Sequence, residues 1–121
     1  MEEELWAAIA AHREWKMKLL HAIDNGTSSL DPTFIRPDNN CDFGKWIYDF
    51  TPSIAETSFY NEVKALHQQF HKAAANVVEL AVVGNNEEAK KSVNSGSYHD
   101  SSSRLVEALT KWLNSNTSKN S

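Results

Sequence analysis

The sequence has one cysteine, three prolines and four glycines, and it lacks any long apolar run. A lone cysteine, Cys41, cannot form a disulfide within the chain. No apolar stretch approaches the length of about 20 residues that crosses a bilayer, and the first residues have neither the basic nor the apolar part of a signal peptide. We therefore expect a protein of the reducing cytoplasm that does not enter a membrane.

Positive charge is also scarce, because 12 lysines and arginines face 16 aspartates and glutamates, for a formal net charge of −4. A nucleic acid or an anionic membrane surface would need a concentrated basic excess, so we expect neither as a partner. With 121 residues, the chain suits one domain whose core needs no disulfide.

Strand-like alternation is missing as well, whereas apolar residues recur at helical spacing. The pattern predicts long helices over about 2–25, 58–83 and 85–114, the last weakened and open to a bend by its Asn, Ser and Gly residues at 94–97. Gly26 and Gly84 are expected to end the first two. The final residues 115–121 have nothing to bury and are expected to be disordered.

A short helix over residues 41–50 is predicted to start at a cap on Asn40 and to carry Cys41 in its first turn. Gly44 would let another backbone come close to it. A single helical turn at Pro32–Ile35 fits the preceding connection. The fold prediction is an all-α antiparallel bundle of three long helices plus this short Cys-bearing helix, forming one domain over residues 1–114.

Two histidines, His67 and His71, stand four residues apart in the main predicted helix, so both imidazoles can reach one metal ion. His12 lies on the inward stripe of the first helix. If these two helices pack antiparallel, the three histidines lie at similar heights. Cys41 completes a possible set, because the start of a helix favours its thiolate. Such a set suits Zn²⁺ in a closed tetrahedron.

Three segments with these residues resemble the signature motifs of the chemoreceptor zinc-binding (CZB) domain family of bacteria. They are His12-Arg13-Glu14-Trp15-Lys16, Cys41-Asp42-Phe43-Gly44-Lys45-Trp46 and Leu66-His67-Gln68-Gln69-Phe70-His71. The resemblance spans the chain from about Leu5 to Trp112. It implies a three-histidine, one-cysteine zinc site made by His12, Cys41, His67 and His71, in a helical bundle that often forms a homodimer.

The resemblance also implies a sensory or regulatory role in bacterial signalling. Family members usually sit at an end of a chemoreceptor or a diguanylate cyclase, which links them to chemotaxis or cyclic-di-GMP. The implied inputs are zinc itself and oxidants such as hypochlorous acid, which would make Cys41 redox-reactive and release its short helix. The 121 residues contain neither a receptor coiled coil nor a cyclase, so a stand-alone regulator and a piece of a larger protein both remain open, and the signalling partner is unknown.

Two other functions remain open at this point. A closed four-ligand site is typical of structural zinc, and the bundle would then be a dimerisation or interaction module. A hemerythrin-like di-iron oxygen binder is also a helical bundle, but it needs more histidines and bridging carboxylates. We expect no enzymatic activity, because catalytic zinc keeps one coordination position open.

Some aromatic and histidine residues outside the ligand set have expected places. Trp15 and Trp46 are near the proposed ligands in sequence and would keep water from the metal. His21 and His99 fall outside the inward stripes and are expected at the surface. Trp6 and Leu20 on the first helix would suit a homodimer face.

Overall fold

The structure, a computed structural model, describes residues 2–26 and 30–119 of the chain. Its helices are α1 (Glu2–Asn25), α2 (Pro32–Ile35), α3 (Asp42–Asp49), α4 (Thr57–Val82), α5 (Asn86–Ser95) and α6 (Ser97–Lys119), with one 3₁₀ turn at Ile54–Glu56. No strand occurs in the described part of the chain, so the predicted all-α bundle is confirmed. None of the helices within these ranges combines the length and apolar character that a membrane crossing needs.

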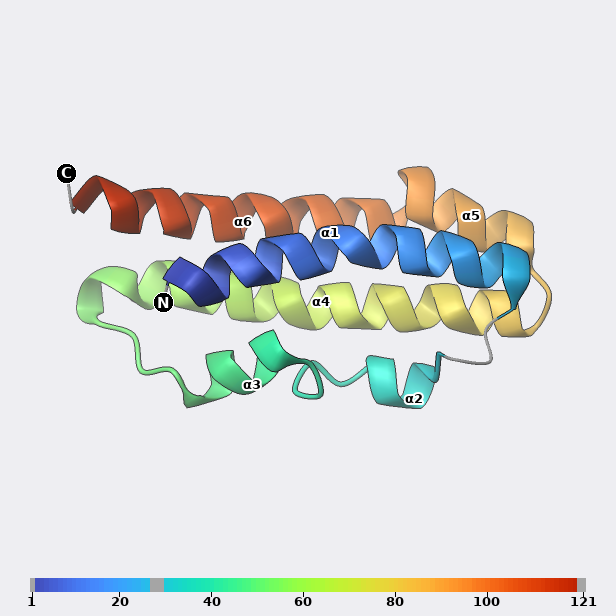
Figure 1. Ribbon diagram of the computed structural model, residues 1–121, viewed down its shortest axis with the longest axis horizontal. Helices are drawn as coiled ribbons and strands as arrows, with labels where there is room; N and C mark the ends of the chain where they lie inside the picture. Colours follow the sequence, from blue (N-terminus) through green and yellow to red (C-terminus); the bar gives the residue numbers. More distant parts are fainter. Residues whose placement is uncertain (1, 27–29, 120–121) are drawn as a thin grey trace.

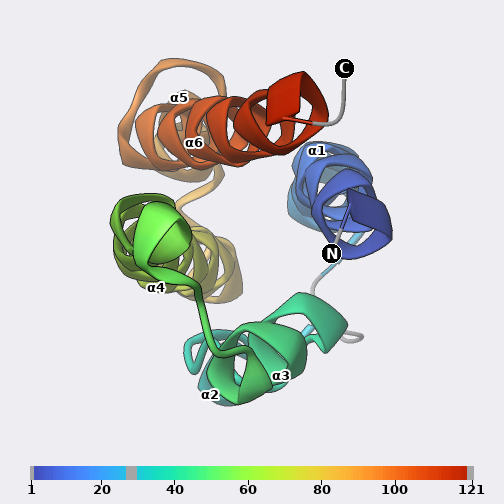
Figure 2. The ribbon, with the colours of Figure 1, turned by 90° about the vertical axis from the view of Figure 1, so that its left-hand side faces the viewer.

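The bundle has four corners, of which α1, α4 and α6 occupy three and the short helices α2 and α3 share the fourth (Figure 2). Figure 1 shows that α1 and α4 run in the same direction, while α2, α3 and α6 run back. The antiparallel packing expected for the first and main helices is therefore wrong. The segment between them is long enough to return along the bundle, so α4 starts at the same end as α1.

Helix α6 packs against both α1 and α4 and closes the apolar core. Burying a large apolar side chain contributes about 1.5–3 kcal/mol, and the core has many of them. Its largest fully buried apolar members are Leu5 and Leu19 from α1, Val63, Phe70, Val77 and Val78 from α4, Ile47 from α3, and Tyr98, Leu105, Leu109 and Trp112 from α6. The three long helices are therefore fixed by packing along most of their length.

The last predicted helix is divided in two. The chain leaves helical geometry at Gly96, between α5 and α6, within the segment whose low propensity indicated a bend. Gly26 and Gly84 both adopt left-handed backbone angles, with φ of 112° and 82°, and end α1 and α4 as predicted.

The C-terminal boundary differs from the prediction, because α6 continues to Lys119 rather than ending near Asn114. Adding residues to a formed helix is cheap compared with starting one, so a formed α6 can extend beyond Asn114. Residues 120–121 of the expected disordered tail lie outside the described residues.

Candidate metal centre

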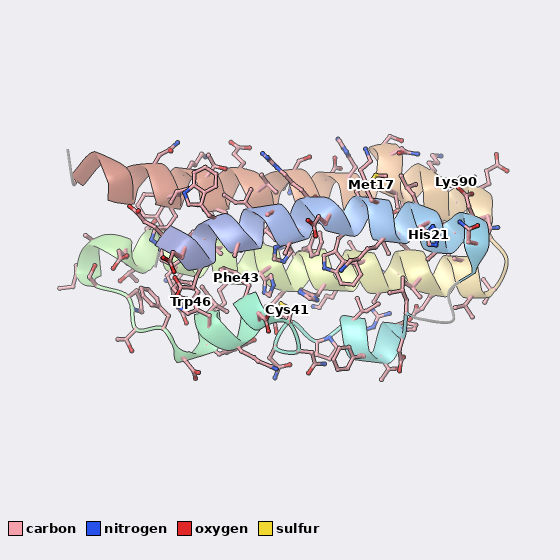
Figure 3. The ribbon with its side chains drawn as sticks, viewed as in Figure 1. Met17, His21, Cys41, Phe43, Trp46 and Lys90 are labelled. Carbon is pink, nitrogen blue, oxygen red and sulfur yellow. The ribbon has the colours of Figure 1, made fainter. Side chains whose placement is uncertain are left out.

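Four side chains from three elements meet in the interior of the bundle. His12 comes from α1, His67 and His71 from α4, and Cys41 from the residue that precedes α3. One possible ligand atom from each residue lies within 4.8 Å of those of the other three. Figure 3 shows Cys41 and Phe43 at the start of α3, on the side toward α4. The structure thus brings together all four residues that the sequence singled out.

Backbone carbonyls orient two of the three imidazoles. Nδ1 of His12 lies 2.6 Å from the Ala8 carbonyl oxygen, and Nδ1 of His71 lies 2.8 Å from that of Ile35. Since a carbonyl oxygen only accepts hydrogen bonds, both Nδ1 atoms carry the proton and both Nε2 atoms keep a free lone pair. The two rings are therefore held in the tautomer that binds metal through Nε2.

Burial keeps the histidines neutral. It lowers the pKa of His12 to about 4, despite the favourable hydrogen bond to Ala8. The pKa of His67 falls to about 2, first through burial and then through the neighbouring His71 and His12 rings. Burial also lowers the pKa of His71, against the opposing hydrogen bond to Ile35. A neutral imidazole is the form that coordinates a metal.

Cys41 is the N-cap of α3 rather than a residue of its first turn. Its Sγ accepts a hydrogen bond from the Gly44 backbone N–H at 3.2 Å. Asn40, the expected cap, instead donates its side-chain amide to the Phe34 carbonyl. The sulfur has a cap's acceptor role because Cys41 has the extended backbone geometry of this position.

The expected preference for a Cys41 thiolate also needs correction. Burial raises the pKa of the Cys41 thiol, and the backbone N–H groups of Gly44 and Phe43 oppose this only in part. Loss of water around the sulfur thus outweighs the helix start in the metal-free chain. A bound divalent cation would reverse the balance, because it strongly favours the thiolate.

Gly44 lets the loop before α3 pack directly on the helix. A Cβ atom at this position would lie 1.7 Å from the Asp38 carbonyl oxygen. No side chain other than hydrogen fits there, which confirms the predicted close approach of another backbone. The close approach sets where Asp38 lies relative to α3.

Two residues of the site were missed by the sequence analysis. The Tyr48 hydroxyl donates to the Asp38 carboxylate, at 2.9 and 3.0 Å from its two oxygens. Asp38 Oδ2 in turn lies 3.9 Å from Nδ1 of His67. The one available sequence signal was that Asp38 stands three residues before Cys41, and an isolated aspartate in a loop carries no periodicity that would mark it.

Both tryptophans expected near the ligands line cavities that reach them. One cavity of about 430 Å³ is lined by Trp15 together with Cys41 and His71. Another of similar volume includes Trp15, Trp46, His12 and Cys41. His21 and His99 are exposed, as expected. That the tryptophans limit water access to the metal stays a prediction.

The donor set fits zinc in its chemistry, and the separations among Cys41, His67 and His71 also fit. Nε2 of His67 lies 3.0 Å from Nε2 of His71, and Cys41 Sγ lies 3.4 and 3.5 Å from these two nitrogens. A zinc tetrahedron with ordinary bond lengths has edges of roughly 3.3 Å between nitrogens and roughly 3.5 Å between sulfur and nitrogen. The three separations in the structure are close to these edges.

The chain was compared with curated proteins, with solved structures and with models of protein families, and the family comparison agrees with the site. No curated protein sequence and no solved structure matches the chain. The sequence model of the chemoreceptor zinc-binding domain matches residues 12–78, more than half of the 121 residues. The matched segment contains all four clustered side chains. The family match and the cluster together fit a zinc-binding signalling domain. The chain therefore belongs to the chemoreceptor zinc-binding (CZB) domain family.

Proposed function

We propose that this chain is a sensory or regulatory domain of bacterial signalling that holds one Zn²⁺ through His12, Cys41, His67 and His71. Its input is zinc availability or an oxidant such as hypochlorous acid. The observation that carries the proposal is the convergence of three buried, neutral imidazoles with the sole cysteine of the chain. Zinc accepts these ligands in a closed tetrahedron, and when bound it supplies the positive charge that favours the Cys41 thiolate.

Cys41 is the ligand that an oxidant can reach. The three histidines are at most 3% exposed, whereas Cys41 is only partly buried and borders both cavities described above. In net terms, the thiolate sulfur takes the oxygen and proton of hypochlorous acid and chloride leaves. The sulfur is oxidised by two electrons to sulfenic acid, which is a poorer zinc ligand.

Oxidation of Cys41 would also loosen α3, because the same sulfur caps this helix through Gly44. Loss of an N-cap typically costs about 1 kcal/mol. Helix α3 has eight residues and is joined to α4 through non-helical residues and a 3₁₀ turn. The proposed signal is therefore a displacement of α3 while the three long helices stay in place.

The proposed output is a contact with a signalling protein or a fused output domain in chemotaxis or cyclic-di-GMP control. A homodimer is supported by exposed apolar residues on α1, where Trp6 and Met17 are 61% and 69% exposed. Leu20, the other expected residue of that face, instead packs partly against the core. A cytoplasmic location suits the domain, because a reducing compartment returns Cys41 to its thiol form.

A purely structural zinc is the second candidate, and the closed donor set favours it. Removing a structural ion would unfold the whole domain, whereas removing a sensory ion would mainly release α3. A di-iron site fits less well, because the cluster formed by the described residues has no carboxylate member. The closed set also gives no support to an enzymatic role, since a substrate would need an open position.

Elemental analysis of the purified chain tests the metal, with one zinc per chain expected. Zinc release after one equivalent of hypochlorous acid, followed with a chromogenic chelator, tests the input. Cys41→Ala should lower zinc affinity and abolish oxidant-driven release. His99→Ala removes an exposed histidine outside the cluster and should behave as the unchanged chain. A Cys41→Ala protein with unaltered affinity and unaltered oxidant response would overturn the proposal.

A further inference from the structure

We infer that Asp38 is a positioning residue for His67: its carboxylate, held by Tyr48, accepts a hydrogen bond from Nδ1–H of the His67 ring and so aims Nε2 at the metal. This role rests on the proposed function, in which His67 binds zinc. It is carried by an unpaired buried nitrogen, a nearby buried carboxylate and the contacts that hold that carboxylate in place.

The first observation is the unpaired nitrogen. His67 is completely buried, and its Nδ1 has no hydrogen-bond partner among the described residues. The corresponding nitrogens of His12 and His71 face backbone carbonyls. An imidazole that coordinates through Nε2 carries its proton on Nδ1, and a buried N–H without an acceptor costs about 1–3 kcal/mol. His67 therefore needs an acceptor that the backbone does not provide.

The second observation is the carboxylate beside this nitrogen. Asp38 Oδ2 lies 3.9 Å from Nδ1 of His67, and Asp38 is only 9% exposed. A relative shift of about 1 Å would bring the two atoms to charge-assisted hydrogen-bond distance. A buried carboxylate is itself costly unless it is paired. The same short movement therefore gives the His67 Nδ1–H an acceptor and the Asp38 carboxylate a second donor besides the Tyr48 hydroxyl.

The third observation is that Asp38 cannot easily turn away. Both of its carboxylate oxygens accept from the Tyr48 hydroxyl, and its backbone carbonyl packs on Gly44. Tyr48 is held from α4, where the Gln68 amide donates to its hydroxyl and the Lys64 ammonium lies 4.7 Å from its ring centre. The carboxylate is thus fixed from α3 and, through Tyr48, from α4.

This arrangement lets Asp38 affect how strongly His67 binds the metal. A carboxylate that accepts from a coordinating histidine sets the ring orientation and makes the other nitrogen a stronger ligand. It also ties α3 to His67 through Tyr48, separately from the tie through Cys41. The position of α3 and the quality of His67 as a ligand are therefore coupled.

The test compares Asp38→Asn and Asp38→Ala with Asp49→Asn, which removes the same charge from an exposed site at the end of α3. Zinc affinity, measured by competition with a chromogenic chelator, should fall about 10–100-fold in both Asp38 variants. Asp49→Asn should leave it unchanged.

A second readout follows the hydrogen bond itself. In the zinc-loaded protein, side-chain ¹H–¹⁵N spectra should show a slowly exchanging His67 Nδ1–H that exchanges faster in Asp38→Asn. Because Asp38→Ala can disturb the loop, Tyr48→Phe provides a milder variant that removes only the hydroxyl. It should speed the same exchange. Tyr60→Phe is the control: it removes a hydroxyl that donates to the Ile47 carbonyl of α3, and it should leave the exchange of His67 Nδ1–H unchanged.

The outcomes separate this role from the proposed function. If the unchanged protein takes up no zinc, the proposed function fails and the role of Asp38 fails with it. If the unchanged protein binds zinc, but Asp38→Asn and Tyr48→Phe keep its affinity and its His67 signal, the role of Asp38 alone is overturned.

Discussion

The two sides of the metal centre differ in how the fold holds them. His12, His67 and His71 lie on helices of 24 and 26 residues that are packed into the core. Cys41 caps a helix of eight residues that shares the fourth corner of the bundle with α2 (Figure 2). The histidines are therefore held by two long helices, whereas Cys41 is held by one short helix, through its cap contact with Gly44 and the loop that packs on it.

This difference indicates where a response to zinc loss or oxidation can occur. Local opening is drawn from parts of a protein with few buried apolar contacts. Helix α3 buries Phe43, Gly44 and Ile47, whereas α4 alone buries nine residues, including both of its histidines. The following predictions test whether the two sides respond as differently as their packing suggests.

The largest effect should come from the histidine side. His67→Ala removes a fully buried ligand, so zinc affinity should fall by more than about 100-fold, beyond the loss expected from an outer partner. The measurement is competition with a chelator of known affinity. His21→Ala, which changes an exposed histidine on α1, should bind zinc normally, and a His67→Ala protein that does the same would contradict the assigned site.

Acid should destabilise the metal-free chain through the same histidines. Burial lowers the pKa of His12 to about 4 and that of His67 to about 2, whereas an unfolded histidine titrates near 6.5. As pH falls below about 6.5, the unfolded chain takes up protons that the folded chain does not. Each of these histidines should then remove roughly 1.4 kcal/mol of stability per pH unit, until it protonates in the fold.

Urea unfolding of the metal-free protein at several pH values between 7 and 4.5 measures this slope. His12→Gln removes one of the titrating groups and should make the slope shallower. A stability that stays level over this range would show that the histidines are not held neutral by burial.

A larger side chain at position 44 should disturb the loop and the helix that hold Cys41. In Gly44→Ala the new Cβ would collide with the Asp38 carbonyl oxygen, and overpacking of this kind costs about 1–3 kcal/mol. The loop and α3 should move apart, so zinc affinity should fall as well. Calorimetric melting and zinc competition measure the two effects. Lys45→Ala, at an exposed position of the same helix, is the matched control and should change neither.

The smallest effect should separate the two roles of Cys41. Serine is a good N-cap but a poor zinc ligand, whereas alanine is neither. In the metal-free state, Cys41→Ser should therefore exceed Cys41→Ala in stability by about 1 kcal/mol, while both bind zinc weakly. Equal stability of the two variants would mean that the contact between the sulfur and Gly44 contributes little.

The predictable parts of the site are those with local periodicity. His67 and His71 are four residues apart, and His12 lies on the apolar stripe of α1, so helical geometry alone pairs the first two and turns the third inward. The bounds of α1 and the single turn at Pro32–Ile35 agree with the sequence prediction for the same reason. Capping residues, glycines and apolar spacing act over a few residues and can be read directly.

The features that escaped prediction depend on how distant segments pack. The shared direction of α1 and α4 depends on how the intervening segment crosses the bundle. The raised pKa of the Cys41 thiol comes from burial by other elements. The contact of Asp38 with Tyr48 joins a loop to a helix, and no spacing rule marks it.

Segment-resolved hydrogen exchange, combined with zinc release, tests the difference between the two sides most directly. One equivalent of hypochlorous acid added to zinc-loaded protein should release the metal and speed exchange across α3 and the loop from residue 36 to 41. Exchange in the central part of α4, from residue 63 to 78, should stay slow. Uniform loss of protection across the whole bundle, or zinc retention with Cys41 oxidised, would contradict a site in which Cys41 is the ligand that dissociates from the zinc on oxidation.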